Sequence, residues 1–169
     1  MPRDNTLSKK QVLAPGIAAA LLMVTAPMLL PAAFAAPRLH GPIECTFDEA
    51  NNELDCTADV SGLGGATTAT GTLEATVTTE TGCINRGSQG QQPSGLDRET
   101  STESDTVEVN VEGGRATFEN TLSADTDRDC PDGMQVVITC VEFSGISLEV
   151  VTNSGQSRTF PISGTFGEC

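Results

Sequence analysis

An acidic stretch near the C-terminal third of the chain carries the clearest chemical signal in the sequence. It reads Asp125-Thr126-Asp127-Arg128-Asp129-Cys130-Pro131-Asp132-Gly133. Its first three alternate carboxylates, Asp125, Asp127 and Asp129, match the first three ligand positions of a D-x-D-x-D calcium loop. The spacing therefore suggests a calcium site made of these three residues, with Asp132 as a possible fourth ligand.

The calcium motif is incomplete, so a second interpretation stays open. Cys130 stands at the sixth position, where the motif has the Gly of its sharp turn, and Val136 stands at the twelfth, where it has a bidentate Glu. The alternative is a solvated acidic turn beside a disulfide. In that case the protein has no cofactor, and calcium is the only one that the sequence suggests.

Catalytic chemistry finds little support in the sequence. His40 is the only histidine and hence the only side chain with a near-neutral reference pKa. It lies next to Gly41-Pro42, where we expect an exposed N-terminal tail. The chain contains no GxSxG, HExxH or P-loop motif. The absence of Trp and Tyr disfavours glycoside hydrolysis and carbohydrate binding, although acidic pairs are plentiful. We expect a protein that is not an enzyme.

Six cysteines indicate a disulfide framework. They are Cys45, Cys56, Cys83, Cys130, Cys140 and Cys169. An even number of cysteines in an exported chain is typical of disulfides, and the absence of a CxxC pair disfavours zinc. Six cysteines allow fifteen connectivities, and the sequence alone does not choose among them.

Local spacing favours one pairing as a first hypothesis. A turn at Ala50-Asn51-Asn52 would set Cys45 opposite Cys56, and that bridge would be worth about 3 kcal/mol. Cys83 ends one strand-like run and Cys130 begins another, so a bridge between them would close a long segment and be worth about 4 kcal/mol. Cys140 and Cys169 then pair by elimination.

The first 35 residues have the pattern of a secretory signal peptide. A basic start at Arg3, Lys9 and Lys10 precedes an uncharged apolar run over residues 12–30 and the small-residue site Ala33-Phe34-Ala35. We expect cleavage after Ala35, a tail over residues 36–42 and one domain over residues 43–169. The alternative, an uncleaved membrane anchor, is disfavoured by prolines within the apolar run.

Charge narrows the classes of partner. The full chain has 9 basic and 23 acidic residues and a net charge of −14. The expected secreted product keeps 22 acids and six arginines, has no lysine and carries a net charge of −16. Such a chain repels nucleic acid and anionic membranes. We expect an extracellular protein or polymer as partner, and no membrane association after cleavage.

The elements that must position these residues are strands. Apolar and polar residues alternate with period two, as in strands with one buried face. The alternating runs cover residues 54–60, 72–78, 106–112, 116–119, 146–150 and 159–166, and residues 134–143 are apolar on both faces. Seven or eight short antiparallel strands predict an all-β, disulfide-stapled, immunoglobulin-like sandwich, with a small closed β-barrel as the alternative. Residues 84–105 are mostly polar and predict a long loop.

Several short segments occur in the same order as in a known group of proteins. They are Val60-Ser61-Gly62-Leu63-Gly64, Cys83-Ile84-Asn85-Arg86-Gly87, Gly90-Gln91-Gln92-Pro93, Gly114-Arg115-Ala116-Thr117-Phe118 and Cys130-Pro131-Asp132. With these segments the chain resembles small secreted bacterial proteins, mainly actinobacterial, whose function is uncharacterised. The resemblance implies a β-rich fold and a Cys83–Cys130 bridge, and it implies no activity.

Three functions remain compatible with these observations. The first is a non-catalytic extracellular binding or adhesion module that uses a surface of the sandwich. The second is a structural component of the cell envelope or a secreted matrix. The third is an inhibitor of a secreted protease that presents the loop over residues 84–105, although the Gly and Ser content of that segment suits a rigid reactive loop poorly.

Overall fold

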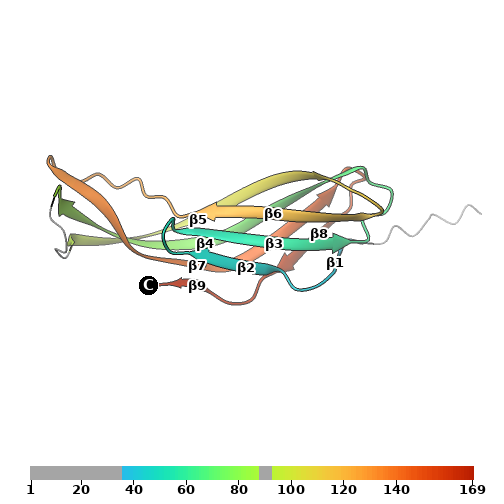
Figure 1. Ribbon diagram of the computed structural model, residues 1–169, viewed down its shortest axis with the longest axis horizontal. Coiled ribbons are helices and arrows are strands. Elements are labelled where there is room, and N and C mark those ends of the chain that lie inside the picture. Colours follow the sequence, from blue (N-terminus) through green and yellow to red (C-terminus); the bar gives the residue numbers. More distant parts are fainter. Residues whose placement is uncertain (1–35, 88–92) are drawn as a thin grey trace, which may run out of the picture. The chain divides into compact units, whose positions relative to one another are not determined.

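The described part of the chain consists of β-strands joined by turns. The computed structural model describes residues 36–87 and 93–169, all of which belong to one compact unit, so the predicted signal peptide lies outside the described residues. Over these ranges there are nine strands and no helix (Figure 1). The strands are β1 (Arg38–Leu39), β2 (Glu44–Asp48), β3 (Glu53–Ser61), β4 (Thr68–Asn85), β5 (Ser94–Asn110), β6 (Arg115–Ser123), β7 (Met134–Thr152), β8 (Ser157–Pro161) and β9 (Phe166–Glu168).

The strands form two antiparallel sheets. In the first sheet β6 pairs with β3 along its whole length. On the other side of β3, β2 pairs with residues 53–57 and β1 pairs with residues 60–61. The second sheet has the order β5-β4-β7-β8, and β9 pairs with β7 next to β8. The sheets are not joined into a closed barrel. The predicted two-sheet sandwich is therefore confirmed, and the barrel alternative is wrong.

The core fills the space between the sheets with alternate residues of every long strand. In β3, for example, Leu54, Cys56, Ala58 and Val60 are buried, while Asp55, Thr57 and Asp59 are exposed. Phe118 of β6 and Phe143 of β7 are the largest fully buried side chains. The period-two pattern thus identified the core-facing residues of β3 and β6 correctly, because each sheet has one face against the core and one in water, whereas the run over residues 159–166 is divided between β8 and β9.

Gly71 of β4 has a specific role in this packing. It faces the other sheet, and a Cβ added there would lie 2.4 Å from Cδ1 of Phe118. Carbon atoms in favourable contact are about 3.5–4.0 Å apart, so only glycine leaves room for this ring. This close approach determines how β6 packs against β4.

The hairpin between β2 and β3 is closed by side-chain hydrogen bonds. The Ala50 amide donates to Oδ1 of Asp48 (2.8 Å), and Nδ2 of Asn51 donates to Oδ2 of the same carboxylate (2.8 Å). These two bonds lower the pKa of Asp48 below its ordinary value of 3.8, because they favour the charged form. Asn52 takes the left-handed conformation with φ of 56°, which Asn tolerates.

The predicted loop over residues 84–105 is wrong. β4 continues to Asn85, and β5 begins at Ser94 and pairs with β4 through to Asn110. Residues 94–102 of β5 are all exposed, so no hydrophobic alternation marks this part of the strand. Backbone pairing with the Thr-rich β4 stabilises it instead.

The expected loose tail over residues 36–42 also differs from the structure. Arg38 and Leu39 form β1 and pair with Ser61 and Val60 of β3. Pro37 is buried, and its carbonyl accepts a hydrogen bond from Nη1 of Arg158 (3.1 Å). The ordered part of the domain therefore begins before residue 43.

The second sheet continues beyond the hydrophobic core. β4, β5 and β7 run past the ends of β2, β3 and β6 (Figure 1). The core cluster ends at Val77 in β4 and at Val141 in β7, whereas these strands continue to Asn85 and start at Met134. We call the described residues 79–87, 93–103 and 134–140 the extension.

Candidate functional site

The cysteines pair as the first hypothesis had them. Cys45–Cys56 joins two residues that lie directly opposite each other in β2 and β3. Cys83–Cys130 joins β4 to the acidic stretch across a sequence separation of 47 residues. Cys140–Cys169 ties the residue after β9 to β7. The described residues contain no free cysteine. Three disulfides are typical of proteins that fold in an oxidising, extracellular environment.

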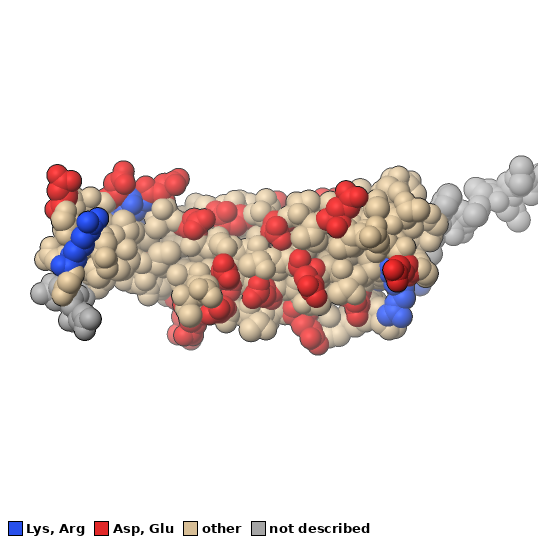
Figure 2. Space-filling model, turned by 45° about the horizontal axis from the view of Figure 1, so that its top comes forward, with Lys and Arg blue, Asp and Glu red and all other residues tan. Residues whose placement is uncertain are grey.

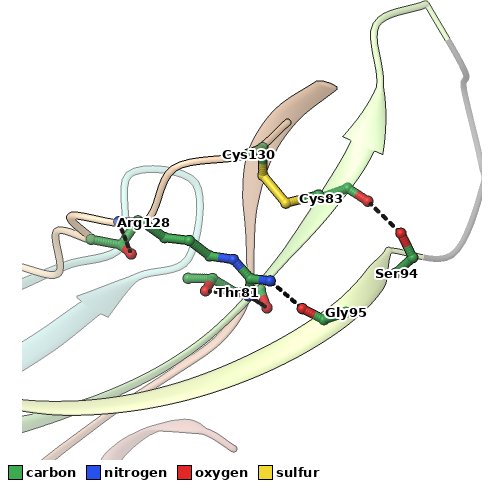
Figure 3. Close-up of a disulfide and its surroundings, with 7 residues drawn as sticks. Thr81, Cys83, Ser94, Gly95, Arg128 and Cys130 are labelled. Atoms are coloured by element: carbon green, nitrogen blue, oxygen red, sulfur yellow. Dashed lines mark hydrogen bonds between the residues drawn. A yellow bond between two sulfur atoms is a disulfide. The ribbon is translucent and has the colours of Figure 1, made fainter. Parts of the chain in front are cut away.

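The acidic stretch is held on the extension by an arginine. Nη1 of Arg128 donates to the carbonyl of Thr81 (2.6 Å) and to its hydroxyl (3.1 Å), and Nη2 donates to the carbonyl of Gly95. Figure 3 shows the guanidinium between these two strands, beside the Cys83–Cys130 bond. A single side chain thus connects β4, β5 and the acidic stretch close to a covalent link.

The four candidate calcium ligands do not converge in the structure. Asp125, Asp127, Asp129 and Asp132 are exposed along the stretch that follows β6. Among the described residues no group of three or more Asp, Glu, His or Cys side chains is placed to hold a metal ion. The geometry favours the interpretation as a solvated acidic turn, in which Arg128 and the disulfide fix the backbone.

A small acidic groove lies between the stretch and the edge of the extension. Its volume is about 130 Å³, and its lining residues are Thr79, Glu99, Ser101, Glu103, Asp125, Thr126 and Asp127. The Ser101 hydroxyl donates to Oε1 of Glu103 (2.8 Å), and the Thr126 hydroxyl donates to Oε2 of Glu99 (3.4 Å). We call this cavity the acidic groove.

Thr79 lies at the floor of the acidic groove. Thr79 is 4% exposed, and its side chain points to the core side of β4, as the side chains of Val77 and Thr81 do. Thr81 hydrogen-bonds to Arg128, whereas the Thr79 hydroxyl has no hydrogen-bond partner within residues 36–87 and 93–169. The groove therefore offers, in addition to its carboxylates, an unpaired hydroxyl on a residue that is otherwise buried.

β5 leaves one backbone edge open beside the groove. Nδ2 of Asn120 donates to the carbonyls of Gly71 (3.4 Å) and Asp105 (3.1 Å). One nitrogen reaches both oxygens only when both carbonyls point into the space between β4 and β5. Since residues of a strand alternate in the side to which they hydrogen-bond, odd-numbered residues of β5 face β4.

The even-numbered residues of β5 consequently direct their backbone groups away from β4. Within the described residues β5 pairs only with β4, so the N–H and C=O groups of Thr100, Thr102 and Ser104 have no backbone partner there. Further along, Asp105 covers the corresponding edge of β6, because its carboxylate accepts hydrogen bonds from the Thr121 amide (3.1 Å) and from Nδ2 of Asn120 (3.0 Å). The open edge of β5 therefore includes the part of the strand that lies in the extension, beside the acidic groove.

Most of the charged side chains on the visible face of the domain are acidic (Figure 2). Figure 2 shows Asp and Glu along the length of one face, and Lys and Arg only toward its two ends. On the outer face of the first sheet the carboxylates are held by neighbouring hydroxyls. Thr121 donates to Asp55 (2.6 Å) and Thr117 donates to Asp59 (2.5 Å) across β3 and β6. This face is a solvated polar surface.

His40 is exposed, as the sequence predicts, although it does not belong to a loose tail. Its amide donates to the carbonyl of Asp59 (2.8 Å), which extends the β1–β3 pairing by one bond. Its surroundings include Glu44, Thr57 and Asp59, which line the same shallow cavity of about 170 Å³. This arrangement supports a structural role for His40.

Two parts of this region were not identified from the sequence. Arg128 stands between two aspartates, and this alternation is also the feature that suggested calcium. The single positive charge within the acidic stretch was the available signal for an internal anchor. Glu99 and Glu103 were assigned to the long loop, so their position opposite Asp125 and Asp127 was not expected.

Comparison with known proteins adds no family to these observations. No family model matches the chain, and no match is found among curated proteins. The described residues contain no helix that is long and apolar enough to cross a membrane.

Proposed function

We propose that this chain is a secreted, non-catalytic binding module that presents the extension of its second sheet to an extracellular protein or polymer. The observation that carries the proposal is that the sheet runs past the hydrophobic core and is nevertheless fixed there. A strand pair that buries little apolar area gains little stability of its own. The Cys83–Cys130 bond and the Arg128 hydrogen bonds hold this extension in one geometry.

Secretion supports the same proposal. The signal-peptide pattern over residues 1–35 and the three disulfides of the domain agree on an oxidising, extracellular destination. We expect the secreted product to begin at Ala36 and to be soluble. The intact mass of the protein in culture medium tests this expectation directly.

The strand order supports the finer assignment as an immunoglobulin-like sandwich. In that fold strands A, B and E lie in one sheet, and C, F and G lie in the other, to which variable-type domains add C′. In chain order β2, β3 and β6 correspond to A, B and E, while β5, β4, β7 and β8 correspond to C′, C, F and G. Such sandwiches commonly act as recognition modules, although the fold alone does not imply a function.

The alternative functions receive less support. The inhibitor hypothesis relied on a long loop over residues 84–105, most of which is strand in β4 and β5. The structural-component hypothesis needs surfaces that associate with further copies of the chain, and a net charge of −16 on the secreted product opposes such association. A binding module requires neither.

A capture experiment with matched variants tests the proposal. The secreted product is immobilised and exposed to the proteins of the culture medium and, separately, to purified cell-wall polymers. Arg128→Met removes the anchor of the extension, and Arg158→Met removes the same charge from β8, where Arg158 stacks on Phe160 at 5.4 Å.

We expect capture of a partner by the unmodified protein and by Arg158→Met, and loss of that partner with Arg128→Met. Far-UV circular dichroism and thermal melting check that both variants keep the sandwich. Equal capture by the two variants would place the binding surface outside the extension. The absence of any specific partner would contradict the binding role itself.

A further inference from the structure

The open edge of β5 and the acidic groove are adjacent and belong to one strand. Even-numbered residues of β5 direct their backbone groups to the open edge, and odd-numbered Glu99, Ser101 and Glu103 direct their side chains into the groove. A strand that paired with this edge would place its own side chains opposite those of β5. The same strand would therefore meet backbone hydrogen-bonding groups and carboxylates in one register.

We propose that β5 accepts an extended basic segment of a partner protein as an added strand, with alternate Lys or Arg side chains directed into the acidic groove. This inference rests on the proposed binding role and names the chemistry of the partner. Addition of a strand to an exposed sheet edge is a common mode of peptide recognition, in which backbone bonds give affinity and side-chain sites give specificity.

Charge decides the kind of segment that fits. The groove contains the carboxylates of Glu99, Glu103, Asp125 and Asp127. Arg128 uses its hydrogen bonds on the neutral groups of Thr81 and Gly95 and donates none to these carboxylates. Basic side chains on every second residue of an added strand would lie along this row, where opposite charges attract.

The unpaired hydroxyl of Thr79, a residue that is 4% exposed, gives the groove a feature that a merely solvated acidic face lacks. It has no hydrogen-bond partner in the described part of the chain and can accept a hydrogen bond from an ammonium or guanidinium group that enters the groove. A metal ion is a poorer occupant, since none of the described carboxylates form a group of three suited to one. A cationic side chain needs no such convergence.

The same charges exclude a second copy of the chain from this edge. Two acidic edges would bring like charges opposite each other, which destabilises strand pairing. The net charge of −16 on the secreted product repels another copy and attracts a basic partner at a distance. The edge is therefore protected against self-association and remains open to a segment of opposite charge.

The probe for this proposal is a synthetic ten-residue peptide of alternating Lys and Thr with blocked ends and a fluorescent label. Two matched peptides accompany it. In one, Glu replaces every Lys, and in the other the amide nitrogens on one edge are methylated, so that they cannot donate to β5. Fluorescence anisotropy with the full secreted product measures binding at 50 mM and 200 mM NaCl.

We expect the Lys–Thr peptide to bind, more weakly at the higher salt concentration, and the Glu–Thr peptide not to bind. Glu103→Gln should weaken binding by about 1.4- to fivefold, the range of one cross-strand charge pair. Thr102→Pro removes an outward N–H and should weaken binding at least as much as methylation of the peptide does. Thr102→Val keeps that N–H and should bind as the unmodified protein does.

Several results would overturn the proposal. Equal affinity for the methylated and unmethylated Lys–Thr peptides would mean that charge alone holds the peptide, with no added strand. This comparison needs no change in the protein, so it remains decisive even if Thr102→Pro does not fold. A dimer in sedimentation experiments that Thr102→Pro abolishes would assign the edge to a second copy.

The two proposals fail in different ways. Capture of a partner that depends on Arg128 but tolerates Thr102→Pro would keep the binding role and reject the β5 edge as its site. Specific peptide binding without any captured partner would keep the edge chemistry and reject the binding role.

Discussion

Replacement of Gly71 by alanine should destabilise the domain, because the two sheets meet at this residue. The added Cβ would lie 2.4 Å from Cδ1 of Phe118, a side chain with no solvent exposure. Relief to a normal carbon–carbon distance requires a shift of about 1 Å in a filled core. Overpacking of this kind costs about 1–3 kcal/mol. A Gly-to-Ala change also restricts the unfolded chain, which returns about 0.4–1 kcal/mol of stability.

Gly65→Ala provides a control that separates these two effects. A Cβ at Gly65 has no atom within 4 Å, so this variant should show only the stabilising effect on the unfolded chain. The difference between the two variants therefore measures the overpacking, at about 1–3 kcal/mol. For a domain of this size that difference corresponds to roughly 3–15 °C in Tm.

Urea unfolding followed by far-UV circular dichroism is the appropriate assay, since the chain has neither Trp nor Tyr for fluorescence. Phe118→Leu should destabilise the parent by leaving a cavity, yet it should recover part of the loss in the Gly71→Ala background. We expect a coupling energy of about 0.5–3 kcal/mol between the two sites. If Gly71→Ala is as stable as Gly65→Ala, or the two sites do not couple, the packing of β6 on β4 described above is wrong.

Three further predictions concern the disulfide, pH and salt. Joint replacement of Cys83 and Cys130 by alanine should lower the unfolding free energy by at most about 4 kcal/mol, which is the chain-entropy value for a separation of 47 residues. Urea unfolding measures this loss. No loss would mean that the bond contributes nothing to the stability of the extension. The pKa of the Asp48 carboxyl, measured by NMR, should lie below 3.8. Its contribution to the unfolding free energy is therefore present above pH 3.8 and disappears as the pH falls through the lowered pKa. Asp48→Asn should remove this pH dependence. NaCl should raise Tm by screening the excess negative charge, and CaCl2 at equal ionic strength should raise it no further; a calcium-specific increase that Asp127→Asn abolishes would restore the calcium site.

The sandwich was predictable because its strands have one face in the core. In β3 and, apart from Asn120, in β6 this condition imposes apolar residues at every second position, and the alternation reads directly from the sequence. The Cys45–Cys56 pair was predictable for a related reason, since the turn between β2 and β3 fixes the register and hence the residues that face each other.

The extension was not predictable by the same means. Residues 94–102 of β5 are exposed, so burial imposes no pattern on them, and their strand conformation depends on β4 as a partner. The acidic groove depends on that pairing too, because only the pairing brings Glu99 and Glu103 of β5 opposite Asp125. The sequence shows the carboxylates but not the register that gathers them.

The anchor of the extension has a consequence for the conditions under which the protein keeps its shape. A loop held by calcium opens when the free ion is depleted or chelated, and a clamp that depends on histidine opens as the pH falls. Arginine side chains do not lose their proton in proteins, and Arg128 is part of the chain, so this anchor has no dissociation constant and no competitor in solution. The edge of β5 is consequently displayed in the same form in metal-poor and metal-rich surroundings.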